Sequence, residues 1–300
     1  MKILVTGSNG FLGSNLVTFF SEKEEYDVLS TSRNVPARNG KSTHFVGDLL
    51  NVSFVEDMFH KIRPDVVINT VSLVNVDQCN DDPELARKIT VTTAENIAKA
   101  CAKYSSRLIY ISTDHLFDGK NAPYTEKDIP HPVNEYGRSK YQAEQVSQKY
   151  VPDSILIRTN FFGISPANHT ITFGEWVYNN LRDKKPMTLF VDYYFSPLEV
   201  NYLAEALDAI IKSDYSGIIN VAGSERCSKY EFGIELARIC GFATNAITAS
   251  QIAPDSFRAP RQPDLSLISE KFERTFNQKL PTLSQSLGRF CKNCKTDCNK

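Results

Sequence analysis

Short apolar runs alternate with longer amphipathic stretches through the first half of the chain. The short runs are typical of buried strands, whereas the longer stretches repeat apolar residues at a helical spacing. The predicted strands are residues 2–6, 27–31, 43–46, 65–69, 107–112 and 154–158, and the predicted helices are 11–20, 54–61, 83–104 and 136–150. Strands that alternate with helices form parallel βαβ units. The pattern therefore predicts an α/β fold with a doubly wound parallel sheet.

The second half of the chain is less regular. It predicts helices at 173–180, 198–212 and 229–240, a strand at 217–221, and a loop rich in proline and arginine at 254–263. We expect residues 1–163 to form a dinucleotide-binding domain to which 198–224 returns. A smaller α/β substrate-binding lobe is expected from 164–197 and 225–290, followed by a Cys/Lys-rich tail at 291–300.

A glycine-rich turn connects the first strand to the first helix. Gly7 permits a tight turn, Gly10 lets a pyrophosphate approach the backbone, and Gly13 allows close packing of helix on strand. The helix N-terminus offers free N–H groups to an anion. This spacing at the start of the first βαβ unit predicts a dinucleotide site in a Rossmann fold, with Asn9, Phe11 and Leu12 also touching the cofactor. The alternative is a glycine-rich turn that binds nothing.

The end of the second strand indicates which dinucleotide is bound. NAD sites usually have a carboxylate there, but this strand ends in Ser32 and Arg33. A guanidinium can pair with a 2′-phosphate, so we expect NADP(H) to be preferred, with NAD(H) also accepted. Arg33 could instead be an ordinary surface residue. Asp48, followed by Leu49, is placed to accept from the adenine amino group or to cap a helix.

Three residues predict a site for reducing a carbonyl group. Tyr136 and Lys140 are four residues apart, which places them on one face of a helix. A ketone that receives hydride must also receive a proton, and a nearby ammonium lowers the pKa of a tyrosine that delivers it. Thr113 adds a hydroxyl at the end of the fifth strand, where ligands bind in open α/β sheets. Tyr-x-x-x-Lys alone is common on surface helices, so the order of all these motifs carries the argument.

Composition excludes several other classes of protein. The 34 basic and 35 acidic side chains give a net charge of −1, so no general basic excess predicts binding to nucleic acid or membrane. The apolar stretches are too short to span a bilayer and do not fit a signal peptide, so we expect a cytoplasmic protein. Seven cysteines at scattered positions form no disulfide framework. We expect no metal site, and a disordered, redox-accessible tail carrying Cys291, Cys294 and Cys298.

The motifs together resemble the dTDP-4-dehydrorhamnose reductase family of extended short-chain dehydrogenases/reductases. The resemblance is carried by Ser-Thr-Asp-His-Leu-Phe-Asp-Gly at 112–119, Pro-Tyr-Thr-Glu at 123–126, Tyr-Gly-Arg-Ser-Lys at 136–140, and Asn-Thr-Val-Ser at 69–72. It implies NAD(P)H-dependent reduction of the 4-keto group of a nucleotide-linked 6-deoxyhexose. By that resemblance Thr113 polarises the keto oxygen, Tyr136 delivers the proton and Lys140 tunes Tyr136. Thr70, Val71 and Ser72 are expected at the cofactor.

The substrate side is predicted mainly from the same resemblance. Four residues are expected around the sugar, namely Ser112, Asp114, Phe117 and Phe161. Phe161 stands where the family has tryptophan, Thr90 stands where it often has asparagine, and His115 stands where it usually has tyrosine. His115 could bind the sugar, titrate or simply pack. Arg258 and Arg261 are candidates for holding the diphosphate, or are ordinary surface charges.

Two other functions stay open. The same motifs resemble the regulatory β subunit of methionine adenosyltransferase, a dinucleotide-binding partner protein. An epimerase or dehydratase of the same superfamily is the third option, although a dehydratase would have a glutamate beside Asp114 and this chain has none there. A homodimer is also left open.

Overall fold

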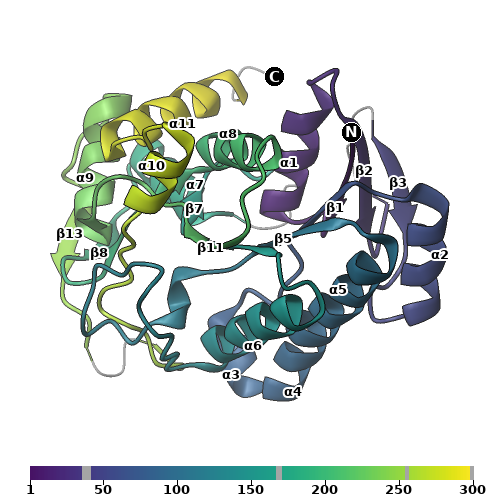
Figure 1. The fold of residues 1–300 in the computed structure, drawn as a ribbon. Coiled ribbons are helices and arrows are strands. Elements are labelled where there is room, and N and C mark those ends of the chain that lie inside the picture. Colours follow the sequence, from purple (N-terminus) through teal and green to yellow (C-terminus); the bar gives the residue numbers. More distant parts are fainter. Residues whose placement is uncertain (36–41, 167–170, 254–256, 298–300) are drawn as a thin grey trace.

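The computed structural model describes residues 1–35, 42–166, 171–253 and 257–297. Its centre is a seven-stranded parallel sheet in the order β11-β6-β5-β4-β1-β2-β3 (Figure 1). The strands are β1 (Lys2–Thr6), β2 (Asp27–Ser32), β3 (Thr43–Val46), β4 (Val66–Asn69), β5 (Arg107–Ile111), β6 (Ile155–Arg158) and β11 (Gly217–Asn220). The predicted doubly wound sheet is confirmed, and all six strands predicted in the first half are present within one or two residues.

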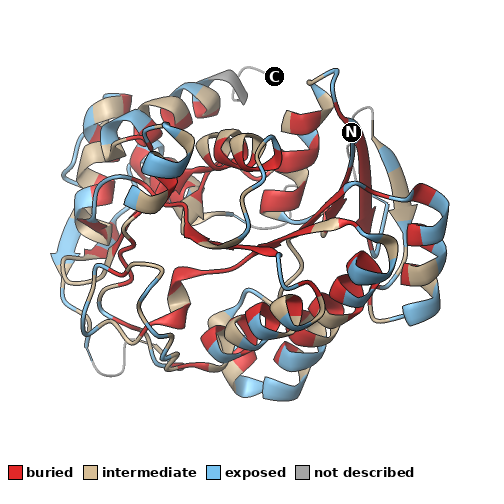
Figure 2. Ribbon diagram, viewed as in Figure 1, coloured by how far each residue is buried: buried red, intermediate tan, exposed pale blue. Residues whose placement is uncertain are grey.

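Helices cover both faces of this sheet. One face carries α1 (Phe11–Ser21), α8 (Val200–Ile211) and α10 (Glu270–Phe276), and the other carries α2 (Val52–Ile62), α5 (Thr93–Tyr104) and α6 (Glu135–Tyr150). Side chains along β1 alternate between the two cores, because Ile3 and Val5 pack with the α1 side and Leu4 packs with the α2 side. The five inner strands β6, β5, β4, β1 and β2 are consequently buried almost throughout, whereas the edge strand β3 is partly exposed, as Figure 2 shows.

The strand order creates one crevice at the carboxyl ends of the strands. β1 pairs with β2 on one side and with β4 on the other, so the chain winds outward in both directions from β1. Open α/β sheets bind ligands at such a switch point. The loops after β1, β4 and β5 all reach this edge.

The predicted helix at 83–104 is interrupted by a π-helical segment. The structure divides it into α4 (Pro83–Ala86), the π-helix η1 (Arg87–Thr92) and α5. Thr90 lies in η1, and its hydroxyl accepts a hydrogen bond from the backbone N–H of Leu73, at 3.1 Å. Thr90 thereby holds the loop after β4. The short helices α3 (Val76–Asp81) and η2 (Asp114–Leu116) follow β4 and β5, and sequence periodicity did not predict them.

A second core lies beside the sheet and is formed by the later part of the chain. It packs α7 (Phe173–Arg182), α9 (Lys229–Cys240) and α11 (Leu283–Asp297) around apolar residues that include Phe162, Phe195 and Phe232. Short strands accompany these helices, namely β7 (Phe161–Phe162), β8 (Met187–Phe190), β9 (Tyr194–Phe195), β10 (Leu198–Glu199), β12 (Cys227–Ser228) and β13 (Ile247–Ser250). We call this second core and its elements the lobe. α10, although within 225–290, packs on the main sheet.

Local signals explain why the lobe helices begin and end where they do. Thr172 and Ser228 are N-caps of α7 and α9, and each forms a capping box with the glutamate three residues later. Gly241 is the C-cap of α9 and has a φ of 79°, the left-handed conformation that glycine favours. The helix predicted at 198–212 starts two residues later, because Leu198 and Glu199 pair with β7.

The prediction of a disordered tail is wrong as far as Asp297. That segment belongs to α11, and its apolar side chains Leu287, Phe290, Cys291 and Cys294 recur at helical spacing and are buried in the lobe. Cys291 forms a disulfide with Cys240 of α9. Lysines occupy the other face of the helix and hid this apolar stripe in the sequence. Cys298 lies outside the described residues.

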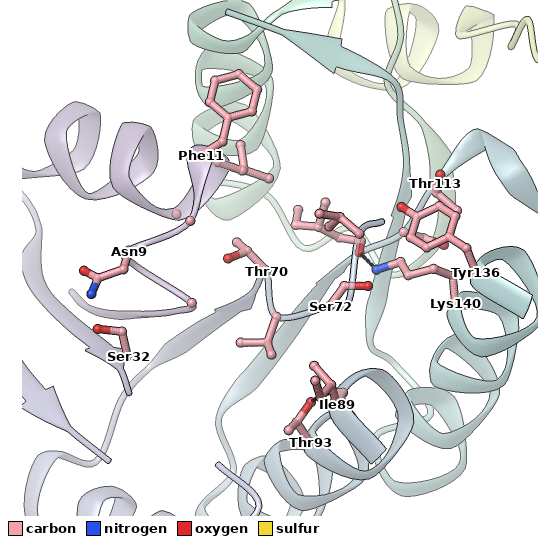
Figure 3. A pocket seen from close by; sticks show the side chains of 18 of the residues that line it. Asn9, Phe11, Ser32, Thr70, Ser72, Ile89, Thr93, Thr113, Tyr136 and Lys140 are labelled. Atoms are coloured by element: carbon pink, nitrogen blue, oxygen red, sulfur yellow. Dashed lines mark hydrogen bonds between the residues drawn. The ribbon is translucent and has the colours of Figure 1, made fainter. Parts of the chain in front are cut away.

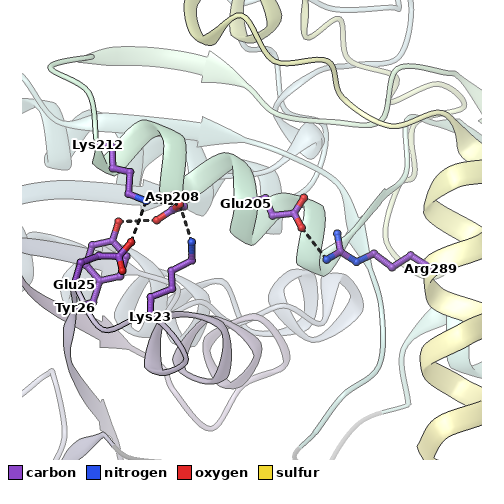
Figure 4. Close-up of polar contacts among 7 residues, drawn as sticks. All are labelled: Lys23, Glu25, Tyr26, Glu205, Asp208, Lys212 and Arg289. Carbon is purple, nitrogen blue, oxygen red and sulfur yellow. Dashed lines mark hydrogen bonds and ion pairs between the residues drawn. The ribbon is translucent and has the colours of Figure 1, made fainter.

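Polar contacts connect α8 to its neighbours on two sides (Figure 4). Asp208 accepts from Lys23 at 2.9 Å and from the Tyr26 hydroxyl at 2.6 Å. Toward the lobe, Arg289 of α11 donates to Glu205 at 2.7 Å. Partly exposed pairs contribute little stability individually, so they mainly fix where α8 and α11 lie. No helix within the described ranges is both long and apolar enough to cross a membrane.

Candidate active site

The glycine turn after β1 has the geometry that the sequence predicts. Gly7 has a φ of 70°, and a Cβ atom there would lie 2.8 Å from the Thr70 hydroxyl oxygen. A Cβ on Gly13 would overlap the carbonyl oxygen of Gly7, so only glycine allows α1 to pack this close to the turn. Gly10 is the N-cap of α1 and has no side-chain cap. The first N–H groups of α1 therefore point into the crevice, where an anion can accept from them.

A cavity of about 800 Å³ runs from this turn across the ends of β4 and β5 (Figure 3). It is lined by all of the residues predicted to bind the cofactor, namely Gly7, Asn9, Gly10, Phe11, Leu12, Gly13, Ser32, Arg33, Asp48, Leu49, Thr70, Val71, Ser72, Tyr136 and Lys140. The structure therefore brings together every residue that was proposed for the dinucleotide. Their binding roles stay predictions.

The end of the cavity near β2 contains Arg33 and no carboxylate from that strand. Arg33 is exposed, and the loop beside it is held because Ser32 and Asn9 both donate to the carbonyl oxygen of Asn34, at 2.7 and 2.9 Å. Asp48 does not cap a helix, since α2 is capped by Asn51. Asp48 accepts from the N–H of Leu50 at 3.0 Å and lines the cavity.

Thr113, Tyr136 and Lys140 meet at the end of β5. Asn134 caps α6 by accepting from the N–H of Gly137 at 2.9 Å, which points the first turn of the helix at the cavity. The Lys140 ammonium donates to the carbonyl oxygen of Ile111 at 2.5 Å. The three predicted catalytic residues therefore line one wall of the same cavity.

Burial shifts the pKa values of both Tyr136 and Lys140 in this wall. It raises the pKa of Tyr136, and a hydrogen bond with the Thr113 side chain opposes that rise. Burial also lowers the pKa of Lys140 to about 7, while the charge of Glu144 raises it. The pKa of Tyr136 thus moves opposite to the predicted direction, because burial outweighs the groups that favour the phenolate. Tyr136 is consequently protonated at neutral pH.

Asp114 is buried next to Thr113 and is held by two donors. The Thr113 hydroxyl donates to one carboxylate oxygen at 3.1 Å, and the Asn160 amide donates to the other at 2.5 Å. Burial raises the pKa of Asp114 to about 6, and these hydrogen bonds oppose the rise. Sequence reasoning missed Asn160. Its signal was available, because it follows β6 as Ser112 and Thr113 follow β5.

His115 is a neutral side chain in this site. Its ring packs edge-on against Tyr136, with the centroids 5.3 Å apart. Burial, together with the charges of Arg261 and Lys229, lowers its pKa to about 3. Within the described residues, its Nδ1 atom has no hydrogen-bond partner. The structure thus leaves the sugar-binding role open and gives no support for titration near neutral pH.

The other residues predicted around the sugar do not all line the cavity. Ser112 and Phe161 line the cavity, and Phe161 packs against Phe11 with ring centroids 5.5 Å apart. Phe117 does not line it, because its ring is buried in the core and stacks on Tyr124.

Arg258 and Arg261 also lie outside the lining. They pair with Asp81 and Asp77 of α3, at 3.0 and 3.1 Å. Both guanidinium groups are therefore engaged by carboxylates. Their role toward a diphosphate stays a prediction.

Comparison with known proteins identifies relatives over almost the whole chain. The family model described as "RmlD substrate binding domain" matches residues 1–296. A dTDP-4-dehydrorhamnose reductase from Escherichia coli (strain K12) is 27% identical over 292 residues, 94% of each chain. The crystal structure of dTDP-4-dehydrorhamnose reductase from Bacillus anthracis in complex with NADP has a TM-score of 0.84 and 25% identity, over 97% of this chain and 98% of that one.

A regulatory protein is among the relatives as well. The methionine adenosyltransferase 2 subunit beta of Mus musculus is 26% identical over 254 residues, 79% of this chain and 71% of that protein.

These comparisons decide several sequence predictions. They confirm the extended short-chain dehydrogenase/reductase assignment, the class of NAD(P)-dependent oxidoreductases acting on nucleotide sugars, and NADP(H) as a fitting cofactor with NAD(H) as the alternative. The chain belongs to the family of the RmlD substrate binding domain, to which the dTDP-4-dehydrorhamnose reductase motifs in its sequence had pointed.

Proposed function

We propose that the protein reduces the 4-keto group of a nucleotide-linked 6-deoxyhexose with NADPH. The observation that carries this proposal is one continuous cavity with the glycine turn at one end and Thr113, Tyr136 and Lys140 along its wall. A dinucleotide and a keto-sugar can lie side by side there. The family relationship supports the same reaction.

The residues around the glycine turn fit a dinucleotide. A Cβ atom at Gly7 or Gly13 would fill the space next to the turn, and the N-terminus of α1 presents free N–H groups to a pyrophosphate. The exposed guanidinium of Arg33 fits a 2′-phosphate. NADPH, when bound, supplies the hydride that reduces the carbonyl carbon.

The protein side chains then handle the carbonyl oxygen. The Thr113 hydroxyl, which donates to Asp114 in the structure, would turn its one hydrogen toward that oxygen and fix its position. Tyr136 is protonated, because burial raises its pKa, and is therefore ready to deliver a proton to the oxygen as its negative charge develops. Lys140 is held by the carbonyl oxygen of Ile111 at the end of β5, and in its protonated form it places positive charge beside the site. The neutral His115 ring packs on Tyr136 and keeps the phenol in place.

The test is oxidation of NADPH and NADH by the purified protein with a panel of 4-keto-6-deoxyhexose nucleotides. We expect NADPH oxidation with at least one member and formation of the corresponding 6-deoxyhexose nucleotide. Absence of oxidation with the whole panel would remove this substrate class.

A regulatory role is the second candidate, since the methionine adenosyltransferase β subunit is among the relatives. It predicts a stoichiometric complex with a methionine adenosyltransferase catalytic subunit in size-exclusion chromatography, without turnover of any keto-sugar. Turnover without such a complex would exclude it. The dehydratase alternative lacks the glutamate expected beside Asp114, where His115 stands, and the epimerase alternative stays open.

Three further expectations are retained within this proposal. The division into a dinucleotide-binding domain and a substrate-binding lobe agrees with where the cavity lies between the sheet and Phe173. A cytoplasmic location and a homodimer stay predictions.

A further inference from the structure

Lys229 is a charged residue in the lobe that the reaction described above does not use. It is the first residue of α9, directly after the capping residue Ser228, and its backbone N–H donates to the carbonyl oxygen of Tyr193 at 3.0 Å. These backbone contacts fix where the side chain starts. None of the motifs described under sequence analysis includes Lys229.

The ammonium group of Lys229 is enclosed by aromatic rings. Its Nζ atom lies 3.3 Å from the centroid of Phe195, 4.3 Å from that of Phe173 and 5.5 Å from that of Tyr193. Ring faces attract a cation but accept no conventional hydrogen bond. Among the described residues, the ammonium has neither a hydrogen-bond acceptor nor an ion-pair partner, and burial lowers its pKa to about 8 while the charge of Asp114 opposes this. The side chain is half-buried, and a partly desolvated cation without a partner is costly, so a role in binding an anion would explain it.

Lys229 lies close to the substrate end of the cavity, although it is not itself one of the lining residues. Phe173, which contacts its ammonium, lines the same cavity as Thr113. The positive charge of Lys229 also acts on Asp114 and His115, the two residues that follow Thr113. The ammonium therefore lies within electrostatic reach of the sugar site, on the side of the lobe.

The other groups nearby do not compete for this role. Asp114 is the nearest carboxylate, but its two oxygens accept from Thr113 and Asn160. The guanidinium groups of Arg258 and Arg261 are paired with carboxylates of α3. A sugar hydroxyl carries no charge to compensate an ammonium, whereas a diphosphate does.

Resting on the proposed function, we propose that Lys229 binds the diphosphate of the nucleotide-linked substrate, a role that the sequence had assigned to Arg258 and Arg261. The contact would fix the end of the substrate that lies away from the keto group. The aromatic rings partly desolvate the ammonium, which strengthens its attraction for phosphate oxygens. Nucleotide sugars should then bind through a charge in the lobe, while the keto group is placed by the main domain.

The test is the binding of thymidine diphosphate and uridine diphosphate to the full chain with NADP⁺ present, measured by calorimetry. Lys229→Met should raise the Kd for the nucleoside diphosphate that binds wild type by about tenfold or more, because a charge-assisted hydrogen bond is lost. The melting temperature should not fall, since methionine suits an aromatic environment and removes a buried charge. A residue with a purely structural role would instead lose stability and affinity together.

The matched control is Lys271→Met. Lys271 also lies over an aromatic ring, that of Tyr215, but it is on α10 and donates to Ile218 at the far edge of the sheet. It should leave the affinity unchanged. If Lys229→Met unfolds, Lys229→Gln serves as the second variant with the same expected loss of affinity.

Each outcome separates this proposal from the proposed function. An unchanged Kd in a folded Lys229 variant, or a wild type that binds neither diphosphate, overturns the assignment of Lys229. A loss confined to the KM of the keto-sugar nucleotide, with diphosphate binding intact, also overturns it and places Lys229 at the sugar. Diphosphate binding that depends on Lys229, without turnover of any keto-sugar, supports the assignment and removes the proposed reaction alone.

Discussion

The two ends of the cavity differ in whether backbone or side chains form them. The cofactor end is made largely of backbone, in short loops that directly follow β1, β2, β3 and β4. The substrate end is made of side chains from segments far apart in the chain, such as Asn160 after β6 and Phe173 on α7. A site built from local backbone is fixed by a few neighbouring residues. A site built from distant side chains depends on how the lobe packs.

This difference predicts that chemistry, cofactor binding and substrate binding can be lost separately. Tyr136 lies where the two ends meet, so its replacement should affect the reaction and neither binding step. The glycine turn and Arg33 belong to the cofactor end alone. His115 belongs to the substrate end.

Tyr136→Phe should lower kcat by about 10²–10⁴-fold, because the proton donor is removed while the ring stays. The Kd for NADPH, measured by fluorescence, should stay within about twofold of the wild-type value, because only the hydroxyl group is lost. Tyr141→Phe, one residue beyond Lys140 on the same helix, is the matched control and should keep its activity. Wild-type turnover in Tyr136→Phe would remove the tyrosine from its role.

Gly13→Ala should destabilise the protein by about 1–3 kcal/mol and weaken NADPH binding, because the added Cβ would overlap the carbonyl of Gly7. Gly288→Ala in α11 is the matched control, since nothing lies within 4 Å of a Cβ there. It should stabilise the helix by about 0.5–1 kcal/mol. Denaturant unfolding measures both changes. Equal effects of the two substitutions would contradict the close packing of α1 on the turn.

Arg33→Ala should raise the KM for NADPH by about tenfold, which is the loss of one charge-assisted contact of about 1.4 kcal/mol. The KM for NADH should change little, because that cofactor has no 2′-phosphate. Arg238→Ala, an exposed arginine on α9 paired with Glu235, should leave both values unchanged. If Arg33→Ala raises the KM for NADPH and the KM for NADH equally, Arg33 does not bind the 2′-phosphate.

His115 should make the protein less stable in mild acid. Burial, with Arg261 and Lys229, lowers its folded pKa to about 3, whereas an unfolded histidine titrates near 6.5. The unfolded chain therefore binds the proton first as the pH falls below about 6.5, and stability is lost between there and about pH 3.

The measurement is the free energy of unfolding of wild type and His115→Phe at pH 7 and 5. Wild type should lose on the order of 1 kcal/mol more than the variant, a value reduced for the partial exposure of the ring. The raised pKa of Asp114, itself due to burial, acts in the opposite direction below pH 6 and is common to both proteins. Identical pH dependence of the two proteins would show that His115 is not held neutral.

The same division explains how much the sequence could predict. Gly7, Gly10 and Gly13 act through their own backbone, and Thr113, Tyr136 and Lys140 stand at a strand end and on one helix face, so spacing alone places them. Phe117 was expected at the sugar, but the turn after β5 directs its ring into the core against Tyr124. Arg258 and Arg261 were expected at the diphosphate, but they form ion pairs with carboxylates of α3, a helix that the apolar periodicity did not predict.

The surroundings of several side chains depend on tertiary packing and could not be predicted from the sequence. Lys229 looked like an ordinary polar residue at the start of a helix, and only the packing of α7, α9 and β9 surrounds its ammonium with rings. The C-terminal part of α11 resembles a polar tail in the sequence, because lysines stand between its cysteines. The direction of the Tyr136 pKa shift depends on burial, which spacing does not report.

The central claim, hydride transfer from NADPH to a sugar carbonyl in this cavity, is tested most directly with NADPH deuterated at the transferring position of the nicotinamide. The deuterated cofactor is supplied with the 4-keto-6-deoxyhexose nucleotide that the protein turns over, and the product is analysed by mass spectrometry and NMR. We predict one deuterium at C4 of the sugar in each product molecule. Cofactor oxidation that leaves the sugar unlabelled, or no oxidation with any such nucleotide, would contradict the account.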